Sequence, residues 1–358
     1  MHKKIAIIGT VGLPSKYGGF ETLAEYLTQY LGRDFDMTVY CSSKSYDEYP
    51  QCYNNAKLEY IALNANGVQS IPYDIVSIFK ALRYADTLLI LGVSGCIVLP
   101  FVKLISKKKI VVNIDGLEWR RAKWNKYAKW FLKFSEKVAV NTADVTVTDN
   151  KVIQEYVLSE YGKESELIAY GADHVNRLAI SDEVYRKYAF LKEKYAFTVC
   201  RIEPENNIHM IVEAISLQTK YPLVMIGNWN ASTYGKELRE KYAHFKHIHL
   251  LDPIYDQEIL NQLRSNSHIY LHGHSAGGTN PSLVEAMALE LPIVAYGVDY
   301  NKETTSNEAI YFSSVEELKN TLNTLIEEEL LNVGKNMKKI ADSQYTWKVI
   351  SQKYADLL

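Results

Sequence analysis

The segment Lys4–Thr22, KIAIIGTVGLPSKYGGFET, decides the fold class of this 358-residue chain. It starts with the pattern of a buried strand, Lys4–Ile8, passes through a glycine-rich turn and enters a helical pattern over Glu21–Leu31. Strand, glycine turn and helix in that order form the first half of a β–α–β unit. Further strands are predicted at residues 37–41, 58–61, 87–91, 110–114 and 143–148. The N-terminal half of the chain is therefore predicted to hold a doubly wound parallel sheet.

The same alternation begins again in the C-terminal half. Strands are predicted there at residues 197–200, 223–226, 248–250, 269–271 and 293–295. A polar, irregular stretch from Tyr170 to Tyr195 is predicted to be the linker. Because the chain is about twice the usual domain length, we expect an α/β protein with two Rossmann-like domains, residues 1–172 and 173–343. Ligands of such folds bind at the carboxyl ends of the strands, so the two domains are expected to face a central cleft.

The composition excludes several classes of protein. A net charge of −2 lacks the basic field of a nucleic-acid binder, so no nucleic-acid partner is expected. The four scattered cysteines form no C-x-x-C pair, which argues against a disulfide framework or structural zinc and fits a reducing cytoplasm. The longest uncharged stretch, Thr87–Val102, has 16 residues and is broken by glycine and proline, too short to span a bilayer. We predict a soluble, cytoplasmic protein.

Two glycines before the first helix are a candidate anion site. Gly18 and Gly19 let backbone amides approach a phosphate, and the helix N-terminus adds partial positive charge. A plain loop-to-helix turn explains the same residues equally well. The spacing is not G-x-G-x-x-G, which disfavours a nicotinamide cofactor.

A second candidate site follows the first strand of the C-terminal half, in the sequence CRIEPENN, Cys200–Asn207. Arg201 stands at the carboxyl end of this strand, where a guanidinium group suits a diphosphate. A surface arginine that caps a helix is the alternative.

The third candidate is HGHSAGGTNPSLVEAMA, His272–Ala288. Its glycines, asparagine and proline precede a helix, which is typical of an anion-binding helix start. Glu285, expected in the first turn of that helix, suits the hydroxyl groups of a ribose and not a phosphate. His272 and His274 have no third ligand at a suitable spacing, so no metal site is predicted.

Together these segments resemble glycosyltransferase family 4, whose members are retaining enzymes with the two-domain GT-B fold. The resemblance covers nearly the whole chain and implies that the last helix, within residues 344–358, packs back on the first domain. It also implies a donor site made of Gly18, Gly19, Arg201, Asn206, Gly278, Thr279, Asn280, Ser282, Leu283 and Glu285. The segments TVGLPSKYGGFET, NIDGLEWRRAKW, RIEPENN and GGTNPSLVEAMA are more narrowly similar to bacterial rhamnosyltransferases that build capsule and cell-wall polysaccharide.

Two positions depart from the family pattern. Asn206 stands where the family has a lysine, and Gly277 stands where it has the first glutamate of its E-x7-E motif. The rhamnosyltransferase subgroup is similar to this chain at both positions, but the diphosphate is left one cation short. We hypothesise that Lys16, in the glycine loop, supplies that cation.

The resemblance implies sugar transfer from a nucleotide donor without a metal or another cofactor. Arg201, the amides of Thr279–Leu283 and those of Gly18–Gly19 would stabilise the leaving diphosphate. Asp115, which follows the apolar strand IVVNI, is predicted to be the general base or to position the acceptor, with an Asx turn as the alternative. Glu203 is a further candidate near the donor sugar, with a helix-entry carboxylate as the alternative.

A basic, aromatic segment between residues 100 and 140 favours contact with an anionic membrane. It holds 11 lysines and arginines against three acids, and aromatic residues recur at helical spacing from Trp124. An apolar stripe packed into the core, with a solvated lysine face, is the alternative. The predicted acceptor and membrane residues are Glu118, Trp119, Arg120, Arg121, Lys123 and Trp124.

The leading interpretation is a retaining transferase that moves L-rhamnose from dTDP-L-rhamnose to a lipid-diphosphate-linked saccharide, at the inner face of the cell membrane. The base and the sugar rest on the subgroup resemblance alone, so UDP- and GDP-sugars stay open. A nucleotide-sugar epimerase and a non-catalytic sugar-binding module are the remaining alternatives.

Overall fold

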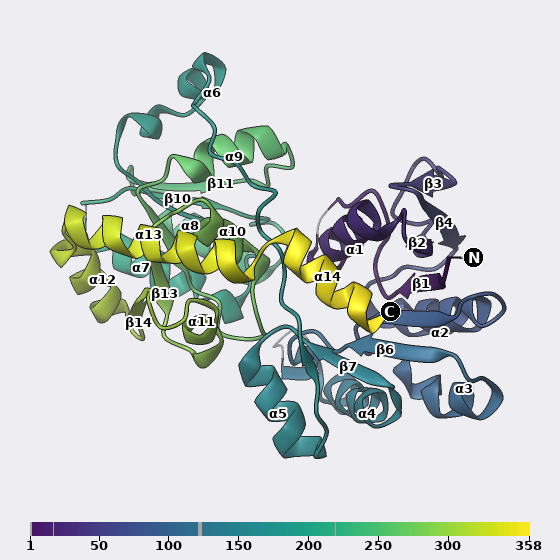
Figure 1. The fold of residues 1–358 in the computed structure, drawn as a ribbon. Helices are drawn as coiled ribbons and strands as arrows, with labels where there is room; N and C mark the ends of the chain where they lie inside the picture. The colour runs from purple at the N-terminus through teal and green to yellow at the C-terminus, as the bar shows by residue number, and fades with distance from the viewer. Residues whose placement is uncertain (1, 17, 121–123, 219) are drawn as a thin grey trace. The chain divides into compact units, whose positions relative to one another are not determined.

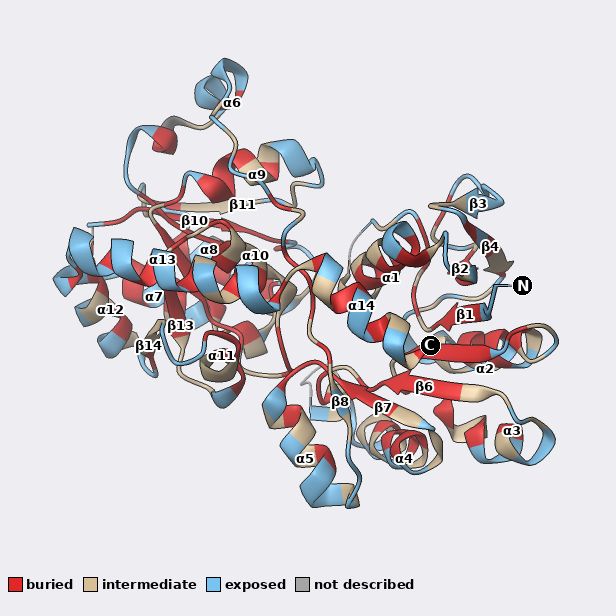
Figure 2. Cartoon of the chain, viewed as in Figure 1, coloured by how far each residue is buried: buried red, intermediate tan, exposed pale blue. Residues whose placement is uncertain are grey.

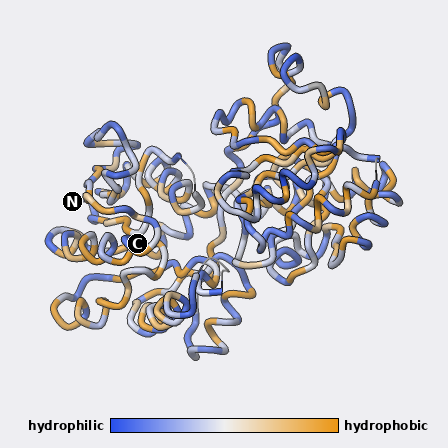
Figure 3. Tube along the Cα trace, turned by 180° about the vertical axis from the view of Figure 1, so that it is seen from behind, coloured by the Kyte–Doolittle hydropathy of each residue, from blue (hydrophilic) through white to orange (hydrophobic). Residues whose placement is uncertain are grey.

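The computed structural model describes residues 2–16, 18–120, 124–218 and 220–358, and it divides into two compact units (Figure 1). Unit 1 comprises the residues up to Gly171 together with Trp347–Leu358, and unit 2 comprises Ala172–Thr346. The strands of both units are largely buried (Figure 2), and their hydropathy colours lie towards the apolar end (Figure 3). The prediction of two Rossmann-like domains with parallel sheets is confirmed.

The described part of unit 1 contains an eight-stranded sheet in the order β3-β4-β2-β1-β5-β6-β7-β8. Neighbouring strands are parallel except at the β3–β4 hairpin on the edge. The chain adds β2 and β4 on one side of β1 and β5 to β8 on the other, so the topological switch point lies between β1 and β5. The strands are β1 (Lys4–Ile8), β2 (Asp36–Ser42), β3 (Cys52–Tyr53), β4 (Ala56–Ile61), β5 (Thr87–Leu91), β6 (Lys109–Asn113), β7 (Val145–Thr148) and β8 (Glu166–Leu167).

Helices cover both faces of this sheet. Right-handed crossovers place helices α2 to α5 on one face and α1 on the other, where α1 packs against the C-terminal helix α14 (Figure 1). The helices are α1 (Gly19–Leu31), α2 (Ser70–Ala81), α3 (Leu99–Ile105), α4 (Lys126–Thr142), α5 (Lys151–Tyr161) and α14 (Trp347–Leu357).

Trp347 anchors α14 to unit 1. Its indole is 1% exposed and stacks on the Tyr26 ring, with 4.4 Å between the ring centroids. A Cβ at Gly171 would stand 2.4 Å from this indole, so the chain needs a glycine there. Further along α14, the Tyr354 hydroxyl accepts a hydrogen bond of 2.8 Å from the Asn113 amide. The C-terminal helix is thus part of the core of unit 1.

The described part of unit 2 contains a six-stranded parallel sheet in the order β11-β10-β9-β12-β13-β14. This order places the switch point between β9 and β12. The strands are β9 (Ala196–Val199), β10 (Leu223–Ile226), β11 (Ile248–Leu251), β12 (Ile269–His272), β13 (Ile293–Tyr296) and β14 (Ile310–Phe312). The helices are α6 (Asp182–Lys187), α7 (Ile208–Ser216), α8 (Thr233–Tyr242), α9 (Gln257–Ser265), α10 (Pro281–Ala288), α11 (Asp299–Thr304), α12 (Val315–Thr324) and α13 (Glu327–Gln344).

The stretch predicted to be a linker is mostly part of unit 2. It contains α6, and its backbone is tied to α9: the Leu178 amide donates to Ser265 Oγ at 3.2 Å, and the Ser181 amide donates to Gln262 Oε1 at 2.8 Å. Its polar composition reflects these side-chain-to-backbone contacts and its exposed surface. Among the described helices, none is both long enough and apolar enough to cross a bilayer.

Replacing Trp347 with alanine tests how firmly α14 belongs to unit 1. Loss of a fully buried indole should lower the free energy of unfolding of unit 1 by about 3–5 kcal/mol. Trp130→Ala, at a side chain that is 70% exposed, is the matched control and should change it by less than about 0.5 kcal/mol. Equilibrium denaturation of both variants measures the difference, and equal effects would contradict this packing.

Candidate functional site

The switch point of unit 2 brings together two loops that carry predicted site residues. β9 and β12 are adjacent, and after them the chain runs to different sides of the sheet. Arg201 follows β9, and the loop Gly273–Asn280 follows β12. In doubly wound sheets ligands bind at this point, beyond the carboxyl ends of the strands.

Side-chain hydrogen bonds join these two loops. The Asn206 amide nitrogen donates to the Arg201 carbonyl at 2.6 Å, so Asn206 Oδ1 faces the other way and lies 2.7 Å from His274 Nδ1. That oxygen can only accept, so the proton of this bond belongs to His274 Nδ1. Ser275 adds two bonds, from its amide and its hydroxyl, to the Glu205 carbonyl at 2.9 and 2.8 Å. Asn206 is thus committed to holding the loop that carries Arg201.

Two glycines make room for this junction. A Cβ at Gly273 would stand 2.1 Å from the Asn206 carbonyl oxygen, so only glycine allows the two backbones to come this close. Gly277 has φ +123°, and its Cβ would stand 3.0 Å from His274 Nε2. The imidazole of His274 therefore occupies the space beside position 277, where the family resemblance places a glutamate.

The Arg201 guanidinium is available for a ligand. Arg201 is exposed, and within the described part of the chain no acceptor or carboxylate contacts its side chain. Its carbonyl is fixed instead, because it accepts from Asn206 and from the Glu203 amide at 2.9 Å. A cation with a fixed backbone and an open head group suits a diphosphate. Glu203 is half-buried and starts the short 3-10 helix Pro204–Asn206.

The start of α10 differs from the prediction. Asn280 Oδ1 accepts from the Ser282 amide at 3.0 Å, and the Asn280 carbonyl accepts from the Leu283 amide, also at 3.0 Å. Pro281 has no amide hydrogen. The helix start itself uses the Ser282 and Leu283 amides, so their contribution to a diphosphate site stays a prediction. Within the described residues, the amides of Gly278 and Asn280 have no internal acceptor.

Glu285 lies in the second turn of α10, not the first as predicted. One carboxylate oxygen is 3.1 Å from His174 Nε2, and the other contacts Arg264, whose side chain is 2% exposed. Burial alone would raise the pKa of Glu285, but Arg264 and His174 outweigh it and lower the pKa to about 2. Glu285 is therefore an ionised acceptor, with 18% of its side chain exposed.

His272 is the last residue of β12. It is 4% exposed, and burial lowers its pKa to about 3, so the ring is neutral. Across the described ranges, no three His, Cys, Asp or Glu side chains are close enough to hold a metal ion.

In unit 1, the loop before α1 is organised by Glu21. Its carboxylate accepts from the Val11 amide at 2.6 Å and from the Thr10 hydroxyl at 3.1 Å, and burial raises its pKa. Gly18 has φ +133°, and a Cβ there would stand 1.9 Å from Glu21 Oε2. Gly19 begins α1. Gly18 therefore serves close packing against a carboxylate, which disfavours a phosphate next to it.

Lys16, the hypothesised extra cation, is held within unit 1. Its ammonium donates to the Ser45 carbonyl at 3.0 Å and lies 4.8 Å from the centre of the Tyr46 ring. Its contribution to a diphosphate site stays a prediction.

Asp115 stands directly after β6 in a left-handed conformation, φ +60°. Its amide donates to Asn113 Oδ1 at 2.9 Å, so the Asx turn here is made by Asn113 and leaves the Asp115 carboxylate out of that turn. Asp115 is half-buried.

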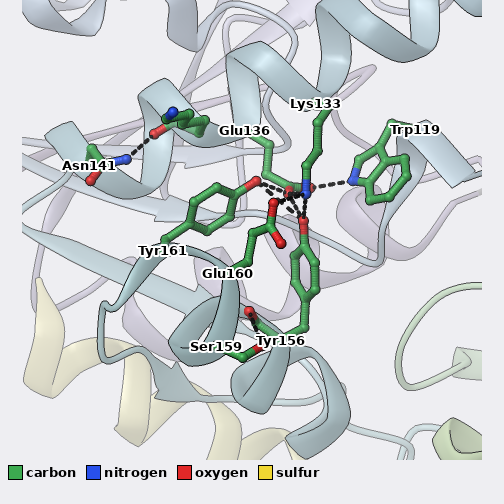
Figure 4. A network of polar contacts seen from close by, with 9 residues as sticks. Trp119, Lys133, Glu136, Asn141, Tyr156, Ser159, Glu160 and Tyr161 are labelled. Atoms are coloured by element: carbon green, nitrogen blue, oxygen red, sulfur yellow. Dashed lines mark hydrogen bonds and ion pairs between the residues drawn. The ribbon is translucent and has the colours of Figure 1, made fainter.

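A buried network around Glu136 holds Trp119, which follows Asp115 in the chain (Figure 4). Glu136, 1% exposed on α4, accepts from Trp119 Nε1 at 3.1 Å and from the hydroxyls of Tyr156 and Tyr161 at 2.7 and 2.6 Å. The Lys133 ammonium lies 4.6 Å from the centre of the Trp119 ring and 4.7 Å from that of Tyr156. Sequence patterns missed this network, because a buried glutamate on a lysine-rich helix looks like a solvated charge.

The other predicted acceptor residues lie on the same loop. Trp124 Nε1 donates to Glu118 Oε1 at 3.0 Å, and the Arg120 guanidinium lies 5.1 Å from the centre of the Trp119 ring. The cap of α4 is Asn125, so Glu118 does not cap that helix. Two predicted residues lie outside the described ranges: Arg121 and Lys123.

The Arg264–Glu285 pair yields a stability prediction. Arg264→Met should lower the free energy of unfolding of unit 2 by about 3–5 kcal/mol, because it leaves a largely buried carboxylate without its main counter-charge. Arg264→Met combined with Glu285→Leu should recover most of that loss. The pKa of Glu285 lies below 4.5, so in the wild type its contribution is present above about pH 4.5 and is lost as the pH falls towards 2. Denaturation across that range measures it, and a double variant as unstable as the single would contradict the pairing.

Each half of the chain matches a known protein family. Residues 2–173 match a family described as a domain of unknown function (DUF1972), and residues 181–344 match the family of glycosyl transferases group 1. The comparison with curated proteins found no match.

Several solved structures are similar over their whole length. Sucrose-phosphate synthase from Thermosynechococcus elongatus has a TM-score of 0.81 at 14% identity, with 99% of this chain and 98% of that chain covered. HepE from Anabaena in complex with UDP-glucose has 0.77 at 15%, covering 99% of both chains. Starch synthase IV from Arabidopsis thaliana, bound to ADP and acarbose, has 0.72 at 12%, with 99% and 98% covered. The chain thus has the two-domain GT-B fold, and its C-terminal half matches the group 1 glycosyl transferases.

Proposed function

We propose that this chain is a retaining glycosyltransferase that moves L-rhamnose from dTDP-L-rhamnose to a lipid-diphosphate-linked saccharide in bacterial surface polysaccharide synthesis. The observation that carries the proposal is the open guanidinium of Arg201 at the switch point of unit 2. The match of residues 181–344 to group 1 glycosyl transferases supports the reaction class.

The donor nucleotide would use three features of unit 2. Arg201 would hold the diphosphate, helped by the free amides of Gly278 and Asn280. Glu285, kept ionised by Arg264, would accept hydrogen bonds from ribose hydroxyls. The solved structures of HepE with UDP-glucose and of starch synthase IV with ADP show such ligands on the same fold.

The reaction breaks the bond between the anomeric carbon and the leaving diphosphate and forms one from that carbon to the acceptor oxygen. Negative charge grows on the diphosphate as its bond breaks, so Arg201 acts where the transition state needs a cation. The acceptor hydroxyl loses its proton to the leaving phosphate, and Asp115 orients that hydroxyl. If Asp115 instead takes the proton, its carboxylate is the general base. No metal takes part in this scheme.

The acceptor would be bound by unit 1. After β6, Trp119 donates to the buried Glu136 and Trp124 donates to Glu118, so these indole rings and the Arg120 guanidinium would be offered to an acceptor there. Rings suit sugars, and cations suit the diphosphate of a lipid-linked acceptor. An enzyme with such an acceptor works at the inner face of the cell membrane. The choice of dTDP and rhamnose rests on the resemblance to rhamnosyltransferases, while HepE favours a UDP-hexose as the competing donor.

A donor panel with an arginine variant tests the proposal. Thermal shifts with dTDP-L-rhamnose, UDP-glucose, UDP-N-acetylglucosamine and GDP-mannose should be largest for dTDP-L-rhamnose, since a ligand that binds the folded state raises the melting temperature. Arg201→Ala should lower kcat by about 10² to 10³-fold with the same donor. The control is Arg186→Ala, which removes another exposed arginine of unit 2 and should leave kcat unchanged. Normal turnover in Arg201→Ala would refute the role of Arg201 at the diphosphate. A larger rise in melting temperature with another nucleotide sugar would mean that this sugar, and not dTDP-L-rhamnose, is the donor.

A further inference from the structure

Helix α4 exposes large aromatic side chains on the side that faces away from unit 1. The face turned into unit 1 includes Ser135 and Glu136, both 1% exposed or less, beside Leu132. The opposite face exposes Tyr127, Trp130 and Phe134, at 74%, 70% and 42%. An exposed stripe of large aromatic side chains on a folded unit marks an interaction surface, whereas single exposed apolar residues do not. The alternative that the aromatic residues at helical spacing pack into the core therefore does not hold for Tyr127 and Phe134.

The neighbouring helix α3 also exposes large apolar side chains. Trp130 and Phe134 are stacked, with 5.9 Å between ring centroids and 6° between planes. On α3, which packs against α4, Phe101, Leu104 and Ile105 are 53%, 84% and 57% exposed. We call the outward side chains of these two helices the α3–α4 face: Phe101, Leu104, Ile105, Tyr127, Trp130 and Phe134. Six large apolar side chains on two packed helices exceed the scattered exposure of an ordinary surface.

Lysines surround this face, and carboxylates do not balance them. Lys107 and Lys108 follow α3, while Lys126, Lys129 and Lys137 stand along α4. None of these five has an ion-pair partner in the described part of the chain. The acidic groups nearest in sequence are already engaged, since Glu136 is buried in its network and Asp144 pairs with Lys103. The α3–α4 face is therefore apolar and carries positive charge around its edge.

We propose that the α3–α4 face binds the surface of an anionic lipid bilayer. The proposal deepens the proposed function, on which it rests, by identifying the surface that would bring the enzyme to a lipid-linked acceptor. Tryptophan, tyrosine and phenylalanine suit the boundary between head groups and acyl chains, and lysines around them suit anionic head groups. The two signals act together, because lysines alone or a few apolar side chains alone give weak, reversible binding.

Charge decides against a second copy of this chain as the occupant. In a symmetric dimer the same surface of both copies meets, so the unpaired lysines of one face would stand against those of the other. Like charges at an interface oppose association. An anionic bilayer has the opposite sign and also accepts the aromatic side chains.

Co-sedimentation with vesicles tests the proposal without donor or acceptor. We expect the wild type to bind vesicles of phosphatidylcholine and phosphatidylglycerol and to stay in solution with pure phosphatidylcholine. Leu104→Ser combined with Trp130→Ser and Phe134→Ser should lower the partition coefficient at least tenfold. Lys107→Glu combined with Lys129→Glu and Lys137→Glu should lower it at least as much, and added salt should weaken the wild type in the same direction.

A matched control carries three changes at exposed apolar residues of unit 2, Tyr255→Ser, Ile326→Ser and Leu331→Ser, whose exposed fractions are 70%, 61% and 61%. It should bind vesicles like the wild type. The lysine variant decides the matter should the apolar variant fail to fold, since Lys107 and Lys137 are exposed and Lys129 is only half-buried.

Three results would overturn the proposal. The wild type could remain in solution with anionic vesicles, or the apolar and lysine variants could bind them as well as the wild type does. In the third, the wild type is a dimer that does not bind vesicles, and the apolar substitutions convert it to a monomer. Transfer to a detergent-solubilised acceptor tests the proposed function separately. Sugar transfer without vesicle binding would contradict only the proposal that the α3–α4 face binds a bilayer. Vesicle binding without sugar transfer would contradict only the proposed enzymatic function.

Discussion

The hydrogen bond between His274 and Asn206 is the constraint on which the donor site depends. Through it, the loop after β12 holds the loop after β9, and the Asn206 amide in turn fixes the Arg201 carbonyl. The backbone of Arg201 is thereby held while its guanidinium stays open. Preorganised charge is worth more than flexible charge, because no ordering is needed when the transition state forms. Gly273 makes the junction sterically feasible.

The two units have the same type of sheet but differ in the loops at its switch point. Each has a doubly wound parallel sheet whose switch point presents loops beyond the strand ends. In unit 2 the loop after β9 carries the open guanidinium of Arg201, and the second turn of α10 carries Glu285, whose carboxylate is kept ionised by Arg264. In unit 1 the loop before α1 holds the carboxylate of Glu21, and after β6 the buried Glu136 accepts a hydrogen bond from Trp119. Unit 2 therefore presents an open cation and an ionised carboxylate, whereas the described residues of unit 1 present buried carboxylates and an indole ring.

Much of the fold follows from the sequence, because short apolar runs alternate with helical periodicity in both halves. Strands of two or three residues, such as β3 and β14, escape such patterns, since they complete a sheet edge and carry no long apolar run. At the site, Arg201 lies where a strand-end arginine is expected. The sequence does not predict the contacts of Asn206, Ser282 and Leu283. Their polar groups are used up by local contacts that depend on how two loops meet. The sequence left two positions open for the aromatic residues of α4, outward or in the core, because helical spacing shows that residues share a face and not which face is buried.

Binding of dTDP to the Asn206→Leu variant, measured by calorimetry, tests the central claim most directly. Leucine has a similar volume but makes neither hydrogen bond, so the Arg201 loop loses its support while the guanidinium itself is unchanged. The account predicts a dissociation constant raised by at least about tenfold, the equivalent of one or two lost buried hydrogen bonds, with the Asn230→Leu control, at an exposed asparagine of unit 2, unaffected. An Asn206→Leu protein that is folded and binds dTDP as tightly as the wild type would contradict it.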